Sequence, residues 1–195
     1  SGHGNTSFTE GIEESCDTVF YEIGYGFYKK DREGIQSFAR EFGYGSKLGI
    51  DLPGEAAGRV PDAAWKKEFN RDYPEYQQWL PGDTVNLSIG QGDMLVTPLQ
   101  VAASYGAIAN NGKLMQPHVL KQVLGSDGNA VYSSEPEVAF ETKVSEANLR
   151  TMQNALERVI SSGTGRSSFR GFSIETAGKY GTAQVAGKDD YAWFV

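Results

Sequence analysis

The side chain with the clearest chemical potential is Lys179, which stands between Gly178 and Gly181 near the end of the chain. Two runs suited to β-strands flank a polar, glycine-containing loop at residues 186–190, so residues 175–195 are predicted to form an antiparallel hairpin. Glycine weakens a strand unless another backbone or a ligand must approach closely. A lysine on such a strand can present its charge to an anion along the edge. A solvated lysine on an edge strand is the simpler alternative.

A second pair of reactive side chains, Ser15 and Asp17, lies at the junction of two helical patterns. Residues 7–10 fit a capping box that starts a short helix, and a second helix is predicted from Thr18 onward. The buried stripe of this second helix is expected to contain Phe20, Ile23 and Phe27. A break between two helices can aim a hydroxyl and a carboxylate out of the array, although both residue types are also ordinary N-caps.

The composition excludes several classes of protein. With 195 residues, 39% of them hydrophobic, the chain can bury a core as one domain or most of one. A net charge of −7 disfavours a nucleic-acid partner. One cysteine, Cys16, cannot form an internal disulfide, and the scattered histidines give no zinc spacing. No cofactor is predicted, and no apolar run is long enough to span a membrane.

The middle of the chain must supply the elements that position these side chains. Asp31 is predicted to cap a third helix that Gly43 ends. The apolar stripe of that helix is predicted to be Ile35, Phe38, Ala39 and Phe42. Residues 45–83 are dense in Gly, Pro and aromatic residues, with room for short helices near Trp65 and Tyr76. Such a long irregular segment is usually functional or wraps the surface.

Residues 84–92 show a short apolar alternation that runs into a glycine turn. A buried helix is then predicted to begin at Thr97 and Pro98 and to close at residues 111–112. A surface hairpin is predicted over residues 118–132, because its Asp-Gly turn supplies a positive φ.

The last long helix is predicted to begin after Ser145 and to end before Gly163. Its core stripe is expected to contain Leu149, Met152, Leu156, Val159 and Ile160. A Gly/Ser/Thr loop at residues 161–168 then leads to the hairpin that carries the lysine.

Several separated motifs occur in a family-specific order: Ser15-Cys16-Asp17, residues 86–92, Thr97-Pro98-Leu99-Gln100, residues 109–112, and Gly178-Lys179-Tyr180-Gly181-Thr182-Ala183-Gln184. Together they resemble the transpeptidase domain of class B penicillin-binding proteins over nearly the whole chain. Residues 49–55 through Trp65, and residues 82–84, look most like the elongation-type enzyme of rod-shape wall synthesis. The resemblance implies an α/β (α+β) fold, with an antiparallel sheet flanked by helices as in serine β-lactamases.

The chemistry implied by the resemblance is acyl transfer from a D-Ala-D-Ala stem peptide through a serine acyl-enzyme that β-lactams inhibit. Ser15 would relay a proton, and Asp17 would replace the family's commoner asparagine. Lys179 would attract the terminal carboxylate of the substrate. The substrate-binding residues implied by the resemblance are Tyr180, Gly181, Thr182 and Gln184. The strand around Thr182 would bind the peptide through main-chain hydrogen bonds, and a backbone N–H would help to hold the oxyanion.

The sequence departs from the family's pattern in two ways. No serine is followed three positions later by a lysine, so the nucleophile and its base are absent from residues 1–195. We therefore expect residues 1–195 to be the C-terminal part of a single transpeptidase domain, incomplete at both ends, without the Ser-X-X-Lys segment and the last strand and helix. The second departure is Tyr180, which replaces the threonine whose hydroxyl helps to bind the carboxylate.

Two rival functions stay open from the sequence. Tyr180 would suit a catalytically silent, penicillin-recognising sensor, which the upstream sequence would distinguish from an enzyme. A serine β-lactamase shares the fold, but no Glu-X-X-X-Asn deacylation motif is found. The resemblance further implies a membrane-anchored parent whose transpeptidase domain is extracytoplasmic, with a glycan-strand polymerase as a partner.

Overall fold

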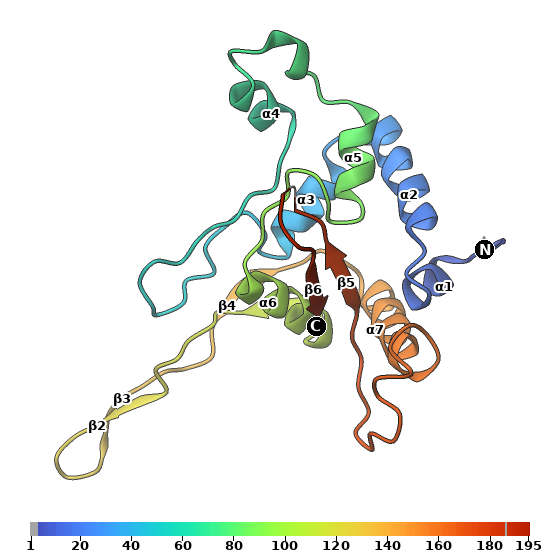
Figure 1. Cartoon of the computed structure of the whole chain (residues 1–195). Helices are drawn as coiled ribbons and strands as arrows, with labels where there is room; N and C mark the ends of the chain where they lie inside the picture. The colour runs from blue at the N-terminus through green and yellow to red at the C-terminus, as the bar shows by residue number, and fades with distance from the viewer. Residues whose placement is uncertain (1–3, 186) are drawn as a thin grey trace. The chain divides into compact units, whose positions relative to one another are not determined.

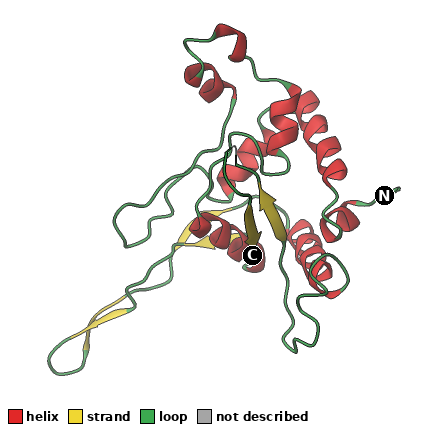
Figure 2. Ribbon diagram, in the orientation of Figure 1, coloured by secondary structure: helices red, strands yellow, loops and turns green. Residues whose placement is uncertain are grey.

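The computed structural model describes residues 4–185 and 187–195 and divides the chain into two compact units. The first unit contains Ser1–Ser37, Pro61–Met94 and Ser145–Val195, and the second contains Phe38–Val60 and Leu95–Val144. The division falls within helix α3, Gly34–Glu41. Figure 1 labels the elements and Figure 2 distinguishes helices from strands.

The first unit is mainly helical and ends in one hairpin. Its α-helices, besides the first part of α3, are α1 (Phe8–Glu13), α2 (Asp17–Lys30), α4 (Ala63–Phe69), α5 (Pro81–Leu87) and α7 (Glu146–Ser161). A 3₁₀ turn, η1, spans Pro74–Tyr76, and the hairpin consists of β5 (Tyr180–Ala183) and β6 (Tyr191–Phe194). The short helices near Trp65 and Tyr76 are therefore confirmed.

Helix α1 begins as its sequence predicts. The Ser7 hydroxyl accepts from the Glu10 N–H at 3.3 Å, and the Glu10 carboxylate accepts from the Ser7 N–H at 2.8 Å. This reciprocal capping box satisfies two backbone donors that the first helical turn leaves free.

Helices α2 and α5 pack closely, and the apolar alternation that begins at residue 84 lies partly within α5. Residues up to Leu87 are helical because Pro81 occupies the first turn and the Asp83 carboxylate accepts the Leu80 N–H at 2.6 Å. A side chain at Gly24 of α2 would come within 2.8 Å of Ser88. The Ser88 hydroxyl donates to the Phe20 carbonyl at 2.9 Å, which ties the two helices together.

Helix α7 carries the deepest apolar face of the first unit. Ser145 caps it as predicted, by accepting from the Asn148 N–H at 3.3 Å. The buried residues of α7 are Leu149, Ala155, Leu156, Val159 and Ile160. The Leu156 carbonyl also accepts the N–H of Gly178 at 3.2 Å, so α7 directly holds the start of the terminal hairpin.

The terminal hairpin is antiparallel, as predicted. Its register pairs Tyr180 with Phe194 and Ala183 with Tyr191. Of the loop predicted at residues 186–190, Ala186 lies outside the described residues.

The second unit contains α6 (Pro98–Ala109) and strands β1 (Lys113–Met115), β2 (Gln122–Leu124), β3 (Ala130–Ser133) and β4 (Val138–Glu141). Its core contains Leu48, Ala107 and Leu114. Thr97 caps α6 as predicted, through a capping box with Gln100. The buried Gln100 amide also donates to the carbonyls of Ser46 and Ala57 at 2.9 and 2.8 Å, which fixes this irregular segment.

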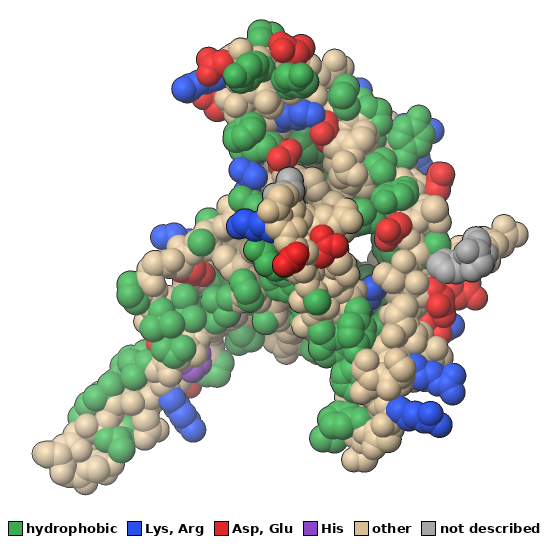
Figure 3. Space-filling model, in the orientation of Figure 1, with side chains coloured by type: hydrophobic (Ala, Val, Ile, Leu, Met, Phe, Trp, Pro, Cys, Tyr) green, Lys and Arg blue, Asp and Glu red, His purple; other side chains and the backbone are tan. Residues whose placement is uncertain are grey.

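The surface hairpin predicted over residues 118–132 is also observed, as β2 and β3. Gly128 takes a φ of 78° in its turn. Figure 3 shows apolar side chains along this ribbon, and those with large exposed areas include Val123, Leu124, Val131 and Tyr132. The Asp51 carboxylate accepts the N–H groups of Val119 and Leu120 at 2.8 and 2.9 Å, which anchors the base of the ribbon.

The structure corrects two predictions about α3. The helix begins at Gly34, and Asp31 is the C-cap of α2, although its carboxylate does accept the Glu33 N–H at 3.3 Å. Phe38, expected in the buried stripe, is 46% exposed. Helical spacing identifies a face of the helix, but tertiary packing decides how much of that face is covered.

All described strand pairs are antiparallel, in the two-stranded sheets β1–β4, β2–β3 and β5–β6. This mixture of helices and short antiparallel sheets confirms the predicted fold class. Among the described residues, no helix is both long and apolar enough to cross a membrane.

Candidate active site

Ser15 occupies a strained turn between α1 and α2. Its φ is 53°, in the left-handed region that residues other than glycine rarely enter. The Cys16 N–H donates to the Gly11 carbonyl at 2.8 Å, which closes the turn and leaves the Ser15 side chain exposed. A conformation that costs on the order of 1 kcal/mol persists only where its surroundings hold it, and such residues cluster at functional sites.

Neither Ser15 nor Asp17 plays the N-cap role that was their simpler explanation. The N-cap of α2 is Cys16, whose side chain makes no capping hydrogen bond. Cys16 is 7% exposed, so it turns inward as expected, whereas Asp17 is exposed in the first turn of α2. A carboxylate there is stabilised by the helix dipole and keeps its oxygens available.

Lys179 lies just before β5, and its backbone continues the hairpin. Its N–H donates to the Val195 carbonyl at 2.8 Å, and the Val195 N–H donates back at 3.2 Å. The Lys179 ammonium donates to the Ser15 hydroxyl at 2.9 Å and to the Tyr180 carbonyl at 2.7 Å. The structure therefore brings Ser15 and Lys179 into direct contact across 164 positions of sequence.

Two opposing effects act on the pKa of Lys179. Partial burial lowers the pKa by penalising the charged form, and the nearby Asp17 carboxylate raises it by a smaller amount. The net result is a pKa below the ordinary value for lysine.

The structure explains the two glycines near Lys179, Gly178 and Gly181, in different ways. A side chain at Gly178 would collide with the Val195 carbonyl and come within 2.8 Å of the Phe194 ring, so the neighbouring strand demands this glycine. Gly181 is exposed, and an added Cβ there would only touch Trp193 at 3.8 Å. The surface beside Gly181 is thus left open.

One edge of β5 carries backbone groups that do not face β6. Because Lys179 and Val195 exchange both of their hydrogen bonds, the alternation of an antiparallel ladder turns the backbone groups of Tyr180 and Thr182 away from β6. Gly181 and the side chains of Thr182 and Gln184 are exposed. This edge has the geometry of a peptide-binding strand.

Gln91 is a contributor that the sequence interpretation did not assign to the site. Its side-chain amide donates to the Thr182 carbonyl at 3.1 Å, on the outward edge of β5. The signal that could have indicated it is an amide held between two glycines of positive φ, Gly90 and Gly92.

The Tyr180 ring takes part in an aromatic contact within the hairpin. It packs against the Phe194 ring, with 4.7 Å between the centroids. A side chain at Gly165 would come within 3.0 Å of the Tyr180 ring. The phenol is therefore part of a packed aromatic contact, and Tyr180 meets Lys179 through its backbone carbonyl.

The described residues offer no metal centre, and the hollow that they do form does not lie at the site. No group of three or more His, Cys, Asp or Glu among them could hold a metal ion. A hollow of about 900 Å³ lies elsewhere, between the end of α7 and residues 163–176.

Comparisons with known proteins show which family the chain resembles. Residues 1–195 match the family described as penicillin binding protein transpeptidase domain. Peptidoglycan D,D-transpeptidase MrdA of Haemophilus influenzae is 36% identical over 193 residues, which cover 95% of this chain and 27% of that protein. MrdA of Acinetobacter baumannii is 35% identical over 185 residues, with 95% and 26% covered.

Solved structures of penicillin-binding proteins also share the fold. Penicillin-binding protein PBP2 of Helicobacter pylori, in complex with MreC, superposes with a TM-score of 0.77 at 36% identity, covering 99% of this chain and 33% of that one. Pseudomonas aeruginosa PBP2, in complex with WCK 5153, gives 0.78 at 33% identity, with 97% and 40% covered. The chain spans about a quarter to two fifths of the length of these relatives.

The chain therefore belongs to the penicillin-binding protein transpeptidase family, in its PBP2/MrdA-type elongation branch. This membership confirms the family that the sequence motifs indicated.

The electrostatics of the site can be tested at Asp17. Replacing Asp17→Asn removes the negative charge that raises the Lys179 pKa, so that pKa should fall further. The measurement is an NMR titration of the chain with ¹³C-labelled lysine. Glu22→Gln, an exposed change on the same helix, is the matched control. An unchanged or higher Lys179 pKa in Asp17→Asn would contradict the assigned interaction.

Proposed function

We propose that this chain supplies the proton-relay and carboxylate-binding parts of a serine D,D-transpeptidase that cross-links peptidoglycan stem peptides during cell-wall elongation. The observation that carries the proposal is the 2.9 Å hydrogen bond from the Lys179 ammonium to the Ser15 hydroxyl. These residues come from two of the separated motifs, and a solvated edge lysine would have no reason to meet Ser15.

In the proposed reaction, a serine with its own lysine base attacks the carbonyl of the penultimate D-Ala of a D-Ala-D-Ala stem peptide, and the terminal D-Ala leaves. An amine of a neighbouring strand then takes the acyl group and frees the serine. Ser15 relays the proton, since a hydroxyl can accept from Lys179 while it donates to a third group. Lys179 attracts the terminal carboxylate of the substrate. A lysine whose pKa burial has lowered exchanges protons more readily near neutral pH than an exposed lysine does.

The stem peptide lies along the outward edge of β5 in this proposal. Thr182 offers its outward N–H, while its carbonyl already accepts from Gln91. An N–H that is held in place before the reaction can stabilise the oxyanion of the tetrahedral intermediate. Gly181 leaves the adjacent surface clear, and the exposed Gln184 side chain completes this edge.

Residues 1–195 would then be the C-terminal part of a single transpeptidase domain whose serine nucleophile belongs to the parent protein. The parent is proposed to be membrane-anchored, with this domain extracytoplasmic, and to act with a glycan-strand polymerase. β-Lactams would inhibit it by acylating the same nucleophile. A silent penicillin sensor is the second candidate, favoured by Tyr180 in place of threonine.

A direct test uses a fluorescent penicillin. The 195-residue chain should form no covalent adduct, because none of its serines has a lysine three positions later. The parent protein should be labelled, and more slowly when it carries Ser15→Ala. Intact-mass spectrometry reads out both proteins. A stoichiometric mass increase at any serine of the 195-residue chain would contradict the proposal that the nucleophile lies outside these residues. An unlabelled parent would favour the silent sensor.

The role of Tyr180 gives a second test. Because its ring packs on Phe194, Tyr180→Thr should lower the free energy of unfolding by about 2 kcal/mol and leave the penicillin-labelling rate of the parent within about twofold. Tyr191→Thr, on an exposed ring of the same hairpin, should cost less. Chemical denaturation and labelling kinetics measure the two effects. A labelling rate raised tenfold to a hundredfold would instead place residue 180 at the carboxylate of the ligand. One regained hydrogen bond to a charged group produces roughly that change in rate.

A further inference from the structure

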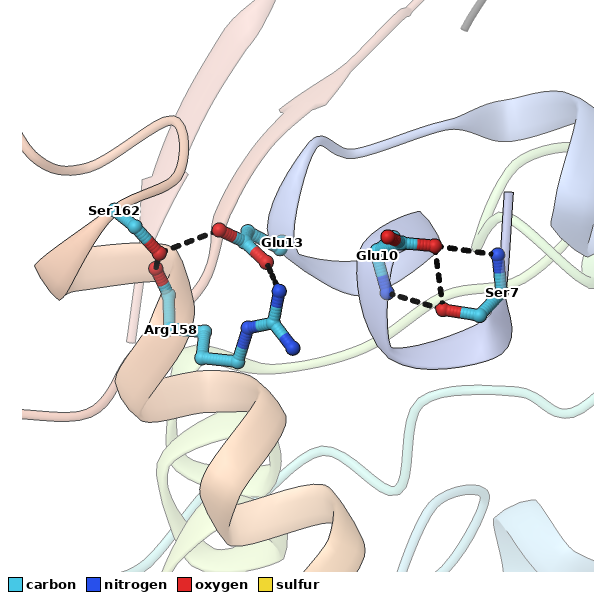
Figure 4. Close-up of polar contacts among 5 residues, drawn as sticks. All are labelled: Ser7, Glu10, Glu13, Arg158 and Ser162. Carbon is cyan, nitrogen blue, oxygen red and sulfur yellow. Dashed lines mark hydrogen bonds and ion pairs between the residues drawn. The ribbon is translucent and has the colours of Figure 1, made fainter. Parts of the chain in front are cut away.

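The end of α1 is fastened to the end of α7 by a buried carboxylate. Glu13 is only 6% exposed, and its carboxylate pairs with the Arg158 guanidinium and accepts the Ser162 hydroxyl. Figure 4 shows the Glu13 carboxylate lying between these two side chains of the α7 region. A buried carboxylate left unpaired is costly, so this arrangement strongly prefers one geometry.

The backbone of the same residue is held as well. The Glu13 carbonyl accepts the Thr164 N–H at 3.2 Å. A side chain at Gly163 would collide with that carbonyl, so the close approach requires glycine. Both the side chain and the backbone of Glu13 are therefore fixed, two residues before Ser15.

The segment 163–165 also reaches the lysine side of the site. The Gly165 N–H donates to the Val159 carbonyl at 2.8 Å, which anchors the segment on α7. Gly165 lies against the Tyr180 ring, where an added Cβ would stand 3.0 Å away. Residues 163–165 thus connect Glu13, two residues before Ser15, with Tyr180, the residue after Lys179.

Helix α7 holds the other end of this path too. The Leu156 carbonyl accepts the N–H of Gly178, the residue before Lys179. The backbone on both sides of the Ser15–Lys179 contact is therefore attached to the α7 region. Glu13, two residues before Ser15, makes one attachment, and Gly178, one residue before Lys179, makes the other. The 2.9 Å hydrogen bond between Ser15 and Lys179 depends on both attachments.

We infer that Glu13, Arg158 and Ser162 form a positioning clamp that, together with residues 163–165, holds Ser15 in its left-handed turn against the Lys179 ammonium. Glu13, Arg158 and Ser162 are positioning residues, since they would act on Ser15 through the backbone of α1. The inference rests on the proposed function for the roles of Ser15 and Lys179, whereas the geometry it describes can be tested without activity.

The test compares two arginines of α7. Arg158→Met removes the clamp, and Arg150→Met breaks an exposed pair with Glu146 on the same helix, where the N–O distance is 2.8 Å. In the 195-residue chain with ¹³C-labelled lysine, the NOE between the Ser15 Hβ and Lys179 Hε protons should disappear in Arg158→Met and persist in Arg150→Met. Circular dichroism confirms that each variant is folded.

A milder variant, Ser162→Ala, serves as the test if Arg158→Met does not fold. Ser162→Ala deletes one hydrogen bond to Glu13 and should weaken the same NOE. An NOE that survives unchanged in the folded Arg158→Met chain, or in Ser162→Ala where Arg158→Met fails to fold, overturns the inference. So does an equal loss in Arg150→Met.

The parent protein separates this inference from the proposed function. If both hold, Arg158→Met should slow penicillin labelling by on the order of tenfold to a hundredfold, as small misplacements of catalytic groups do. If the parent is never labelled but the NOE behaves as expected, the proposed function fails and the clamp stands. If the parent is labelled but the NOE is unchanged in the clamp variants, the clamp is wrong and the proposed function stands.

Discussion

The buried Glu13 carboxylate is the constraint on which the first unit's site depends. A carboxylate with so little exposure must be paired, and Arg158 and Ser162 can pair it only when the ends of α1 and α7 meet. This contact between the two helix ends fixes Glu13, and Ser15 follows only two residues later. The terminal hairpin is attached to the same helix through Leu156 and Gly178, so one element organises residues from both ends of the sequence.

The chemistry of the site follows from partial enclosure. Lys179 is buried enough for its pKa to fall, while Asp17 offsets part of that effect. On the outward edge of β5, side chains already occupy the carbonyls of Tyr180 and Thr182, which makes the edge richer in free donors than in free acceptors. A ligand with a carboxylate and a developing oxyanion suits such an edge better than a ligand rich in donors.

Much of this arrangement is predictable from local signals. The capping boxes at Ser7 and Thr97, the cap at Ser145 and the terminal hairpin are all observed, because their causes lie within a few residues. The apolar alternation of residues 84–92 does not form a strand, because packing of α5 on α2 overrides a short period-two pattern. The ordered motifs indicated Ser15 and Lys179, but Glu13 acts through long-range partners that no local pattern reveals.

The central claim is that Ser15 and Lys179 interact directly, and a double-mutant cycle tests it most directly. Unfolding free energies of the 195-residue chain are compared with those of Ser15→Ala, Lys179→Met and the double variant. The account predicts a coupling energy of about 1 kcal/mol, as expected for a partly exposed hydrogen bond from a charged donor. A coupling energy within about 0.3 kcal/mol of zero would contradict it, because independent sites are additive at that level.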